Sequence, residues 1–314
     1  MFPSYRRPLF LFSRHLETIY PALLRRVEDV SFDRERIATN DDDFLDLDWL
    51  RKGNPRLVII SHGLEGSSRR AYITGMARAL SSNGFDVLAW NFRGCSDDMN
   101  HQLRFYHSGA TDDLQLVIHH AVAKGYADIS LIGFSLGGNL TLKYLGEAVP
   151  HETVKRAVTF SVPLDLYNSC LKISQPGNFV YSRRFLRNLK AKVRKKATQM
   201  NGLDLTGIDA IQTLVDFDNR YTAPLHGFRD ALDYYNRCSA LYYLKSITTP
   251  TLIVNAQNDP FLSDTCYPMG ITKENPAVRF EAPSHGGHVG FAQFNKNGLY
   301  WSEERALAFL NSQT

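Results

Sequence analysis

A chain of 314 residues, 44% of them hydrophobic and 22% charged, has the composition of a globular protein that buries a sizeable core. Its net charge of +4 is too small to indicate a nucleic-acid partner, and no run of about 20 apolar residues predicts a membrane span. Arginines interrupt the N-terminal segment, so it lacks the unbroken apolar run of a secretory signal. The four cysteines are scattered without metal-like spacing, which is typical of reduced thiols in a cytoplasmic protein.

Two alternating segments near the N-terminus, residues 27–32 and 44–50, are expected to form antiparallel strands at one edge of a sheet. From residue 56 onward, short β-rich runs alternate with helical stretches, which predicts an α/β fold with a mostly parallel sheet and helices on both faces. The predicted core strands are residues 56–61, 85–90, 129–134, 156–162, 250–255 and 278–282. The predicted helices are residues 70–82, 111–124, 136–147 and 303–311.

Residues 163–245 interrupt this alternation, because they contain no clear strand and lie between two predicted core strands. An insertion of this size in an α/β enzyme is usually a lid or cap over the active site. We therefore predict one α/β core, residues 1–162 and 246–314, and a lid formed by residues 163–245.

The segment GFSLG at residues 133–137 matches the G-x-S-x-G pattern, and it joins a predicted strand to a predicted helix. A sharp turn between strand and helix exposes the serine hydroxyl above the sheet, and only small residues fit beside it. The following helix N-terminus favours negative charge at a reacting carbonyl. Ser135 is therefore the predicted nucleophile.

The segment SHGLEG at residues 61–66 follows the first core strand. Enzymes with a G-x-S-x-G turn place an oxyanion donor in this loop. We expect the backbone N–H groups of Leu64 and Leu136 to form the oxyanion hole. His62 is interpreted as a structural histidine rather than a catalytic one.

A serine nucleophile needs a histidine base that a carboxylate orients. Asp259 follows the strand at residues 250–255, and His288 lies in a glycine-rich loop after the last strand. Both lie at the carboxyl edge of the predicted sheet, where open α/β sheets place their sites. His285 remains an alternative to His288 as the base, and Asp165 an alternative to Asp259 as the acid.

Several segments together resemble the YheT-like branch of the α/β-hydrolases, which includes bacterial esterases and, more distantly, eukaryotic hydrolases and yeast medium-chain ester synthases. These segments are HLETIYPALLRR, SHGLEGSSRRAYI, AWNFRGCS, YHSGATDDL, GFSLGGNLTLKYLGE, NDPFL and GGHVGF, which span the chain from about residue 15 onward. The resemblance implies a triad of Ser135, Asp259 and His288. It also implies action on esters of fatty or other hydrophobic acyl groups.

Three further patterns have simpler explanations. His107 and Asp112 fit an H-x-x-x-x-D acyltransferase pattern, but Asp112 lies where a helix is expected to start, with Thr111 as its N-cap. His119 and His120 have no ligand partners at metal-binding spacing, so no metal is expected. Because no phosphate-binding glycine loop is present, no nucleotide cofactor is expected either.

A basic run at residues 183–196 is interleaved with apolar residues at helical spacing, of which Phe185, Leu189 and Val193 are examples. This pattern predicts an amphipathic lid helix with a solvated basic face and an apolar face over the pocket. It is also compatible with peripheral contact to anionic lipid.

The sequence thus predicts a serine-dependent carboxylic ester hydrolase that forms an acyl-enzyme on small esters with a hydrophobic or medium-chain acyl group, without a cofactor. Two alternatives remain open. The same serine can transfer the acyl group to an alcohol, or the chain can be a catalytically silent binding protein with this fold.

Overall fold

The apolar runs of the sequence pair into one sheet in the computed structural model, which describes residues 2–312, and that sheet has eight strands within this range. The strands are β1 (Asp33–Ala38), β2 (Phe44–Leu50), β3 (Arg56–Ser61), β4 (Asp86–Asn91), β5 (Asp128–Phe134), β6 (Val154–Phe160), β7 (Thr251–Val254) and β8 (Val278–Glu281). Their order is β1-β2-β4-β3-β5-β6-β7-β8. β2 pairs antiparallel with β1 and β4, and all other neighbours are parallel, which confirms the predicted α/β fold.

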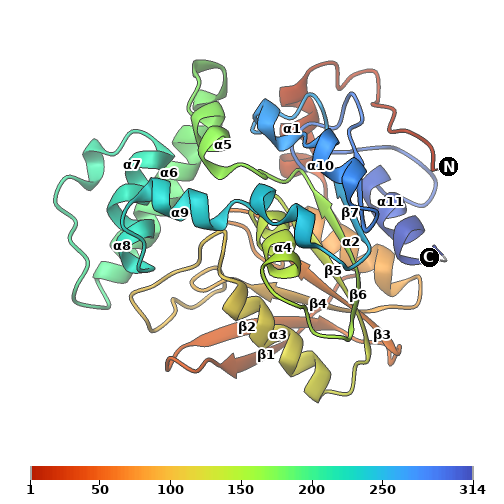
Figure 1. Cartoon of the computed structure of the whole chain (residues 1–314), viewed down its shortest axis with the longest axis horizontal. Helices are drawn as coiled ribbons and strands as arrows, with labels where there is room; N and C mark the ends of the chain where they lie inside the picture. Colours follow the sequence, from red (N-terminus) through yellow and green to blue (C-terminus); the bar gives the residue numbers. More distant parts are fainter. Residues whose placement is uncertain (1, 313–314) are drawn as a thin grey trace.

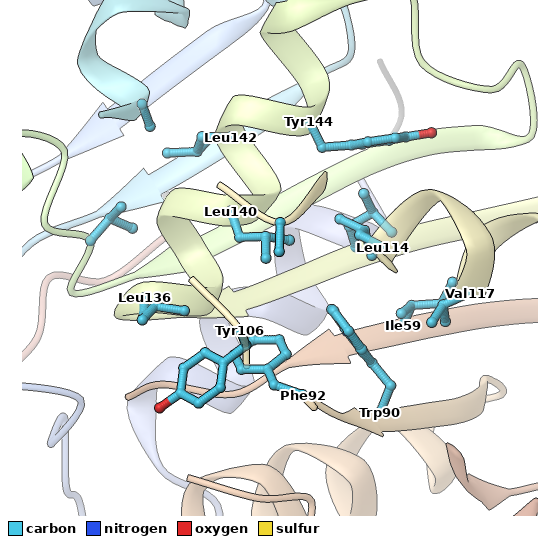
Figure 2. Close-up of a cluster of buried hydrophobic side chains, with 14 of the residues drawn as sticks. Ile59, Trp90, Phe92, Tyr106, Leu114, Val117, Leu136, Leu140, Leu142 and Tyr144 are labelled. Carbon is cyan, nitrogen blue, oxygen red and sulfur yellow. The ribbon is translucent and has the colours of Figure 1, made fainter. Parts of the chain in front are cut away.

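Helices cover both faces of the sheet because successive residues of the central strands point to opposite sides. Ile59 of β3 packs with α3 (Thr111–Ala123) and α4 (Leu136–Glu147), and Figure 2 shows this cluster. The next residue, Ile60, packs with α2 (Ala71–Ser81) and α11 (Trp301–Leu310) on the other face. All four helices lie within two residues of their predicted bounds, although Ala110 rather than Thr111 is the N-cap of α3.

The segment between β6 and β7 is helical, and none of residues 161–250 lies in a strand. Its helices are α5 (Leu166–Ile173), α6 (Phe179–Ala197), α7 (Leu214–Phe217), α8 (Ala223–Leu225) and α9 (Ala231–Cys238), joined by short 3₁₀ and π turns. In Figure 1, α7, α8 and α9 lie to the left of the sheet, away from both termini.

The strand expected at residues 27–32 is wrong, because the edge strand β1 comprises Asp33–Ala38. This strand, DRERIA, is too charged to be recognised by apolar alternation. It is stabilised instead by ion pairs across the antiparallel ladder, where Arg34 lies opposite Asp48 and Arg36 opposite Asp46, each pair 2.7 Å apart. A charged edge strand also discourages pairing with another chain.

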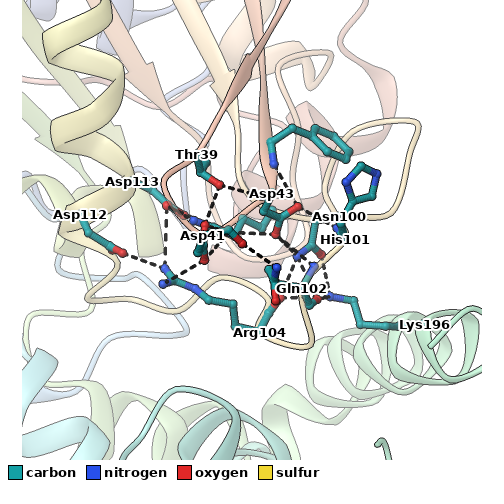
Figure 3. A network of polar contacts seen from close by, with 12 residues as sticks. Thr39, Asp41, Asp43, Asn100, His101, Gln102, Arg104, Asp112, Asp113 and Lys196 are labelled. Carbon is teal, nitrogen blue, oxygen red and sulfur yellow. Dashed lines mark hydrogen bonds and ion pairs between the residues drawn. The ribbon is translucent and has the colours of Figure 1, made fainter. Parts of the chain in front are cut away.

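A buried polar network joins the edge strands to the insertion (Figure 3). Arg93, whose side chain is 2% exposed, pairs with Asp43 at 2.8 Å and with Asp113 at 2.7 Å. Asn100 donates to the same Asp43, and it accepts a hydrogen bond of 2.7 Å from Nζ of Lys196 on α6. A single cluster of charges thus connects the β1–β2 turn, the loop after β4, α3 and α6.

The basic run of α6 is therefore not wholly solvated, contrary to the expectation from sequence. Lys196 is fully buried, with its ammonium group donating to Asn100 and to the carbonyl groups of Gln102 and Arg104. Lys192 is also largely covered, because it pairs with Glu65. The hydrophobic pattern identified the apolar face, but it carries no information on which lysines find buried partners.

Lys196 should make the stability of the protein depend on pH. Burial lowers the pKa of Lys196 to about 7, whereas an unfolded lysine has a pKa of about 10.4. Between these values the unfolded chain binds the proton more strongly, so lowering the pH from 10 to 7 should destabilise the wild type relative to Lys196→Met. The difference between the two free energies of unfolding should change by up to about 1.4 kcal/mol per pH unit. Urea unfolding of both proteins at several pH values measures it, and a constant difference would contradict the prediction.

Candidate active site

Three side chains from distant parts of the sequence form one hydrogen-bonded series at the carboxyl edge of the sheet. Ser135 lies in the turn between β5 and α4, and its Oγ is 3.0 Å from Nε2 of His288. The other ring nitrogen, Nδ1, is 2.8 Å from Oδ2 of Asp259, whose side chain is completely buried. The ring of Phe261 packs on the imidazole with centroids 4.1 Å apart. The geometry is that of a nucleophile, a base and an acid that orients the base.

The two alternatives left open by the sequence lie outside this series. Nδ1 of His285 faces Glu17 at 3.7 Å, and its side chain is 40% exposed. Asp165 is the N-cap of α5, where its carboxylate accepts a hydrogen bond from the backbone N–H of Asn168. Neither side chain is hydrogen-bonded to Ser135 or His288.

The turn that carries Ser135 is strained and tightly packed. Ser135 has φ +53° and ψ −119°, a conformation that a non-glycine residue rarely adopts. A Cβ atom at Gly137 would overlap the carbonyl groups of Ser61 and His62, so a glycine is required there. This close approach brings the N-terminus of α4 against the loop that follows β3.

The backbone N–H groups of Leu64 and Leu136 both lie beside Ser135. Leu136 is the first residue of α4, so its N–H has no intrahelical acceptor. Leu64 belongs to the loop after β3 and lines both cavities together with Ser135. Within residues 2–312, neither amide donates a backbone or side-chain hydrogen bond, which leaves both available to an anionic oxygen.

His62 is fully buried and forms hydrogen bonds to the backbone only. Its Nδ1 is 2.8 Å from the carbonyl oxygen of Gly63, and its Nε2 accepts a hydrogen bond from the N–H of Phe92. Burial lowers the pKa of His62 to about 3. A neutral imidazole therefore links the two loops that follow β3 and β4.

A buried ion pair connects the loop of Leu64 to the insertion. Nζ of Lys192 on α6 lies 2.6 Å from Oε1 of Glu65, and the same carboxylate accepts a hydrogen bond of 2.8 Å from the hydroxyl of Tyr106. The Tyr106 hydroxyl in turn accepts the backbone N–H of Glu65. No local sequence pattern points to this contact, because its partners lie far apart in the chain.

The loop that carries His288 is held by helix α1 (Arg14–Leu24), a contribution that the sequence analysis missed. Glu17, which is 1% exposed, accepts hydrogen bonds from the N–H of Gly286 at 2.5 Å and from Nδ2 of Asn258 at 2.9 Å. Thr18 accepts the backbone N–H of His288 at 2.9 Å. The only sequence feature that pointed to this helix was the segment HLETIYPALLRR, which contributed to the family resemblance but suggested no role in the site.

Two cavities meet at Ser135. The first lies mainly under the insertion and occupies about 990 Å³, and the second lies between α1, α2 and α6 and occupies about 1070 Å³, both including their open mouths. Both are lined by Leu64, Ser135, Phe185, Phe261 and His288. A molecule bound at Ser135 can therefore extend in two directions from the serine.

The remaining sequence candidates are not hydrogen-bonded to this series, although His107 lines the first cavity. Nδ1 of His107 accepts the N–H of Gly109, and Asp112 pairs with Arg104, so the H-x-x-x-x-D residues are not hydrogen-bonded to each other. His120 lies 3.1 Å from Glu35. No group of three or more histidine, cysteine or acidic side chains in the described part of the chain is arranged to hold a metal ion. None of the helices between residues 2 and 312 has both the length and the apolarity to cross a membrane.

Comparison with known proteins agrees with this fold. The family model described as "alpha/beta hydrolase fold" matches residues 56–294. The "Putative esterase YheT" of Escherichia coli is 35% identical over 88% of this chain and 84% of its own length. The phospholipase ABHD3 of Bos taurus is 30% identical over 84% of this chain and 67% of its own length. The esterase Pf2001 of Pyrococcus furiosus has the same fold, with a TM-score of 0.61 at 18% identity over 91% of this chain and 94% of its own.

The packing at Gly137 gives a prediction about stability. Gly137→Ala should lower the free energy of unfolding by about 1–3 kcal/mol, because the new methyl group must displace the backbone of Ser61 and His62. Gly177→Ala is the control, since a Cβ there meets only the end of the Arg14 side chain at 3.8 Å. Denaturant unfolding measures both variants, and equal stabilities would show that the turn tolerates the extra atom.

Proposed function

The chain belongs to the α/β-hydrolase family and is a hydrolase, and from this premise we propose that it is a serine-dependent carboxylic ester hydrolase that works through an acyl-enzyme. The observation that carries the proposal is the series from Ser135 through His288 to Asp259, with contacts of 3.0 and 2.8 Å. Its location beside two unoccupied backbone amides and at the junction of two cavities supports the same reaction.

In the proposed reaction, Oγ of Ser135 attacks the acyl carbonyl while Nε2 of His288 takes its proton. Asp259 holds Nδ1 and stabilises the imidazolium that forms. The amides of Leu64 and Leu136 donate to the oxyanion. His288 then protonates the leaving alcohol, and a water molecule, activated by the same imidazole, attacks the acyl-enzyme and releases the acid. An alcohol in place of that water would give acyl transfer through the same serine.

We propose that the first cavity binds the acyl part and that residues 163–245 act as its cap. Its walls are predominantly apolar, as a hydrophobic acyl chain requires. Residues of the insertion that line it include Ile173, Leu189, Val193, Leu214 and Phe217. These walls favour a hydrophobic acyl chain of medium length over a charged one.

The nucleophile and the acyl preference can be tested together. Ser135→Ala should lower the turnover of p-nitrophenyl esters by about 10⁴-fold or more and abolish labelling by a fluorophosphonate, because the alanine cannot form the acyl-enzyme. The wild type should show an optimum when the acyl chain is lengthened stepwise. Ser246→Ala, at an exposed serine of a short 3₁₀ helix, serves as the control. Near-normal turnover by Ser135→Ala would show that another group is the nucleophile.

The outer face of α6 supports peripheral contact with anionic lipid, which we also propose. Arg183 and Arg187 are exposed on this helix, and the neighbouring apolar side chains of Phe179 and Val180 are 58% and 69% exposed. Exposed apolar groups next to guanidinium groups are suited to the boundary between headgroups and acyl chains.

Lipid contact predicts salt-dependent sedimentation with vesicles that contain anionic lipid. Replacing both Arg183 and Arg187 by Gln should weaken this partitioning by about tenfold or more, since each basic residue contributes about 1 kcal/mol near an anionic surface. Arg229→Gln removes one charge from an exposed residue outside α6 and should have little effect. Equal sedimentation of the wild type with neutral and anionic vesicles would contradict the proposal.

A further inference from the structure

The second cavity is placed to receive the alcohol part of an ester. It opens from Ser135 and His288 on the side away from most of the insertion, between α1, the beginning of α2, and α6. If the acyl chain lies in the first cavity, the oxygen of the leaving alcohol must point toward the remaining space at Ser135. This step rests on the function proposed above.

Two arginines line this cavity from different elements. Arg70 immediately precedes α2, and Arg184 lies on α6, and both side chains are exposed. Among residues 2–312, neither forms an ion pair with a carboxylate. Arg70 donates one hydrogen bond, to the carbonyl oxygen of Glu65, and this bond leaves most of its guanidinium donors available.

The other charges around the cavity do not neutralise these arginines. Among the described residues, Glu65 is the only acidic one in the cavity wall, and its carboxylate is already paired with Lys192 at 2.6 Å. α2 begins at this wall without an acidic residue in its first turn and without a side-chain cap, so its positive N-terminal end is also uncompensated. The space that faces the leaving alcohol is therefore electropositive.

We propose that Arg70 and Arg184 bind an anionic group, such as a phosphate, carried by the alcohol part of the ester substrate. Guanidinium groups pair with phosphate and carboxylate through two parallel N–H donors, which gives orientation as well as attraction. The substrate class is thus an ester with an apolar acyl chain and an acidic alcohol part, and the two cavities recognise the two parts separately.

The test compares two esters, 1-decanoylglycerol and 1-decanoylglycerol 3-phosphate, which differ only in the phosphate group on the glycerol. Both are used below their aggregation concentrations, so that no lipid surface is present. The wild type should have the higher kcat/KM for the phosphorylated ester. Arg184→Gln should lower that value by about tenfold or more, mainly through KM, and leave the neutral ester nearly unchanged, because a hydrogen bond to a charged group is lost.

Arg229→Gln is the control, since Arg229 is exposed and does not line the cavity. It removes the same charge and should leave the ratio of the two kcat/KM values unchanged. The proposal would be overturned by equal effects of Arg184→Gln on both esters, or by equal effects of the two variants on the phosphorylated ester.

A binding measurement separates this proposal from the proposed esterase activity. Calorimetric titration of the Ser135→Ala protein with glycerol 3-phosphate should detect binding that Arg184→Gln weakens and Arg229→Gln does not. Absence of ester turnover together with this pattern would reject the esterase and retain the anion site. Turnover of the neutral ester without any such binding would retain the esterase and reject the anion site. Inorganic phosphate that binds as well as glycerol 3-phosphate would show a free-phosphate site rather than an alcohol site, and would also overturn the proposal.

Discussion

Parallel pairing of β4, β3, β5, β6, β7 and β8 brings all of their carboxyl ends to one edge of the sheet, and the site depends on this constraint. The loop after β3 carries Leu64, the turn after β5 carries Ser135, and the loops after β7 and β8 carry Asp259 and His288. No loop needs to be long to reach its neighbours, because the strands have already placed their ends side by side. The side chain that each loop carries then determines which reactive groups lie at this edge of the sheet.

Two loops of this edge are held by buried polar contacts rather than by apolar packing alone. The His288 loop rests on the carboxylate of Glu17 and the hydroxyl of Thr18. The Leu64 loop is tied to the insertion through Glu65 and Lys192. A buried carboxylate without its partners would be costly, so each contact favours one arrangement over the alternatives. Helix α1 and the insertion thus become structural supports of a site to which they contribute neither the serine, the histidine nor the aspartate.

The sheet and the series of Ser135, Asp259 and His288 were predictable because short contiguous segments of the sequence carry their patterns, as apolar runs and as strand–turn–helix motifs. The sequence analysis missed β1, whose stability comes from the cross-strand pairs of Arg34 and Arg36. It also missed the support of the His288 loop by Glu17 and the burial of Lys196, because both depend on partners far away in the chain. Local patterns carry periodicity and turn chemistry, whereas a long-range polar contact leaves no periodic trace.

Among the helices of residues 2–312, α6 alone lines both cavities, and this position connects the two spaces that open from Ser135. Leu189 and Val193 face the first cavity, Arg184 faces the second, and Phe185 lies between them at the level of Ser135. The helix is anchored at its far end by the buried ammonium of Lys196 and near its middle by the pair of Lys192 with Glu65. Because the anchors fix the position of the helix along its axis, a shift of the helix would change both cavities and the Leu64 loop together. The basic residues of α6 therefore fall into two groups: the buried lysines fix the position of the helix, and the exposed arginines face the second cavity and solvent.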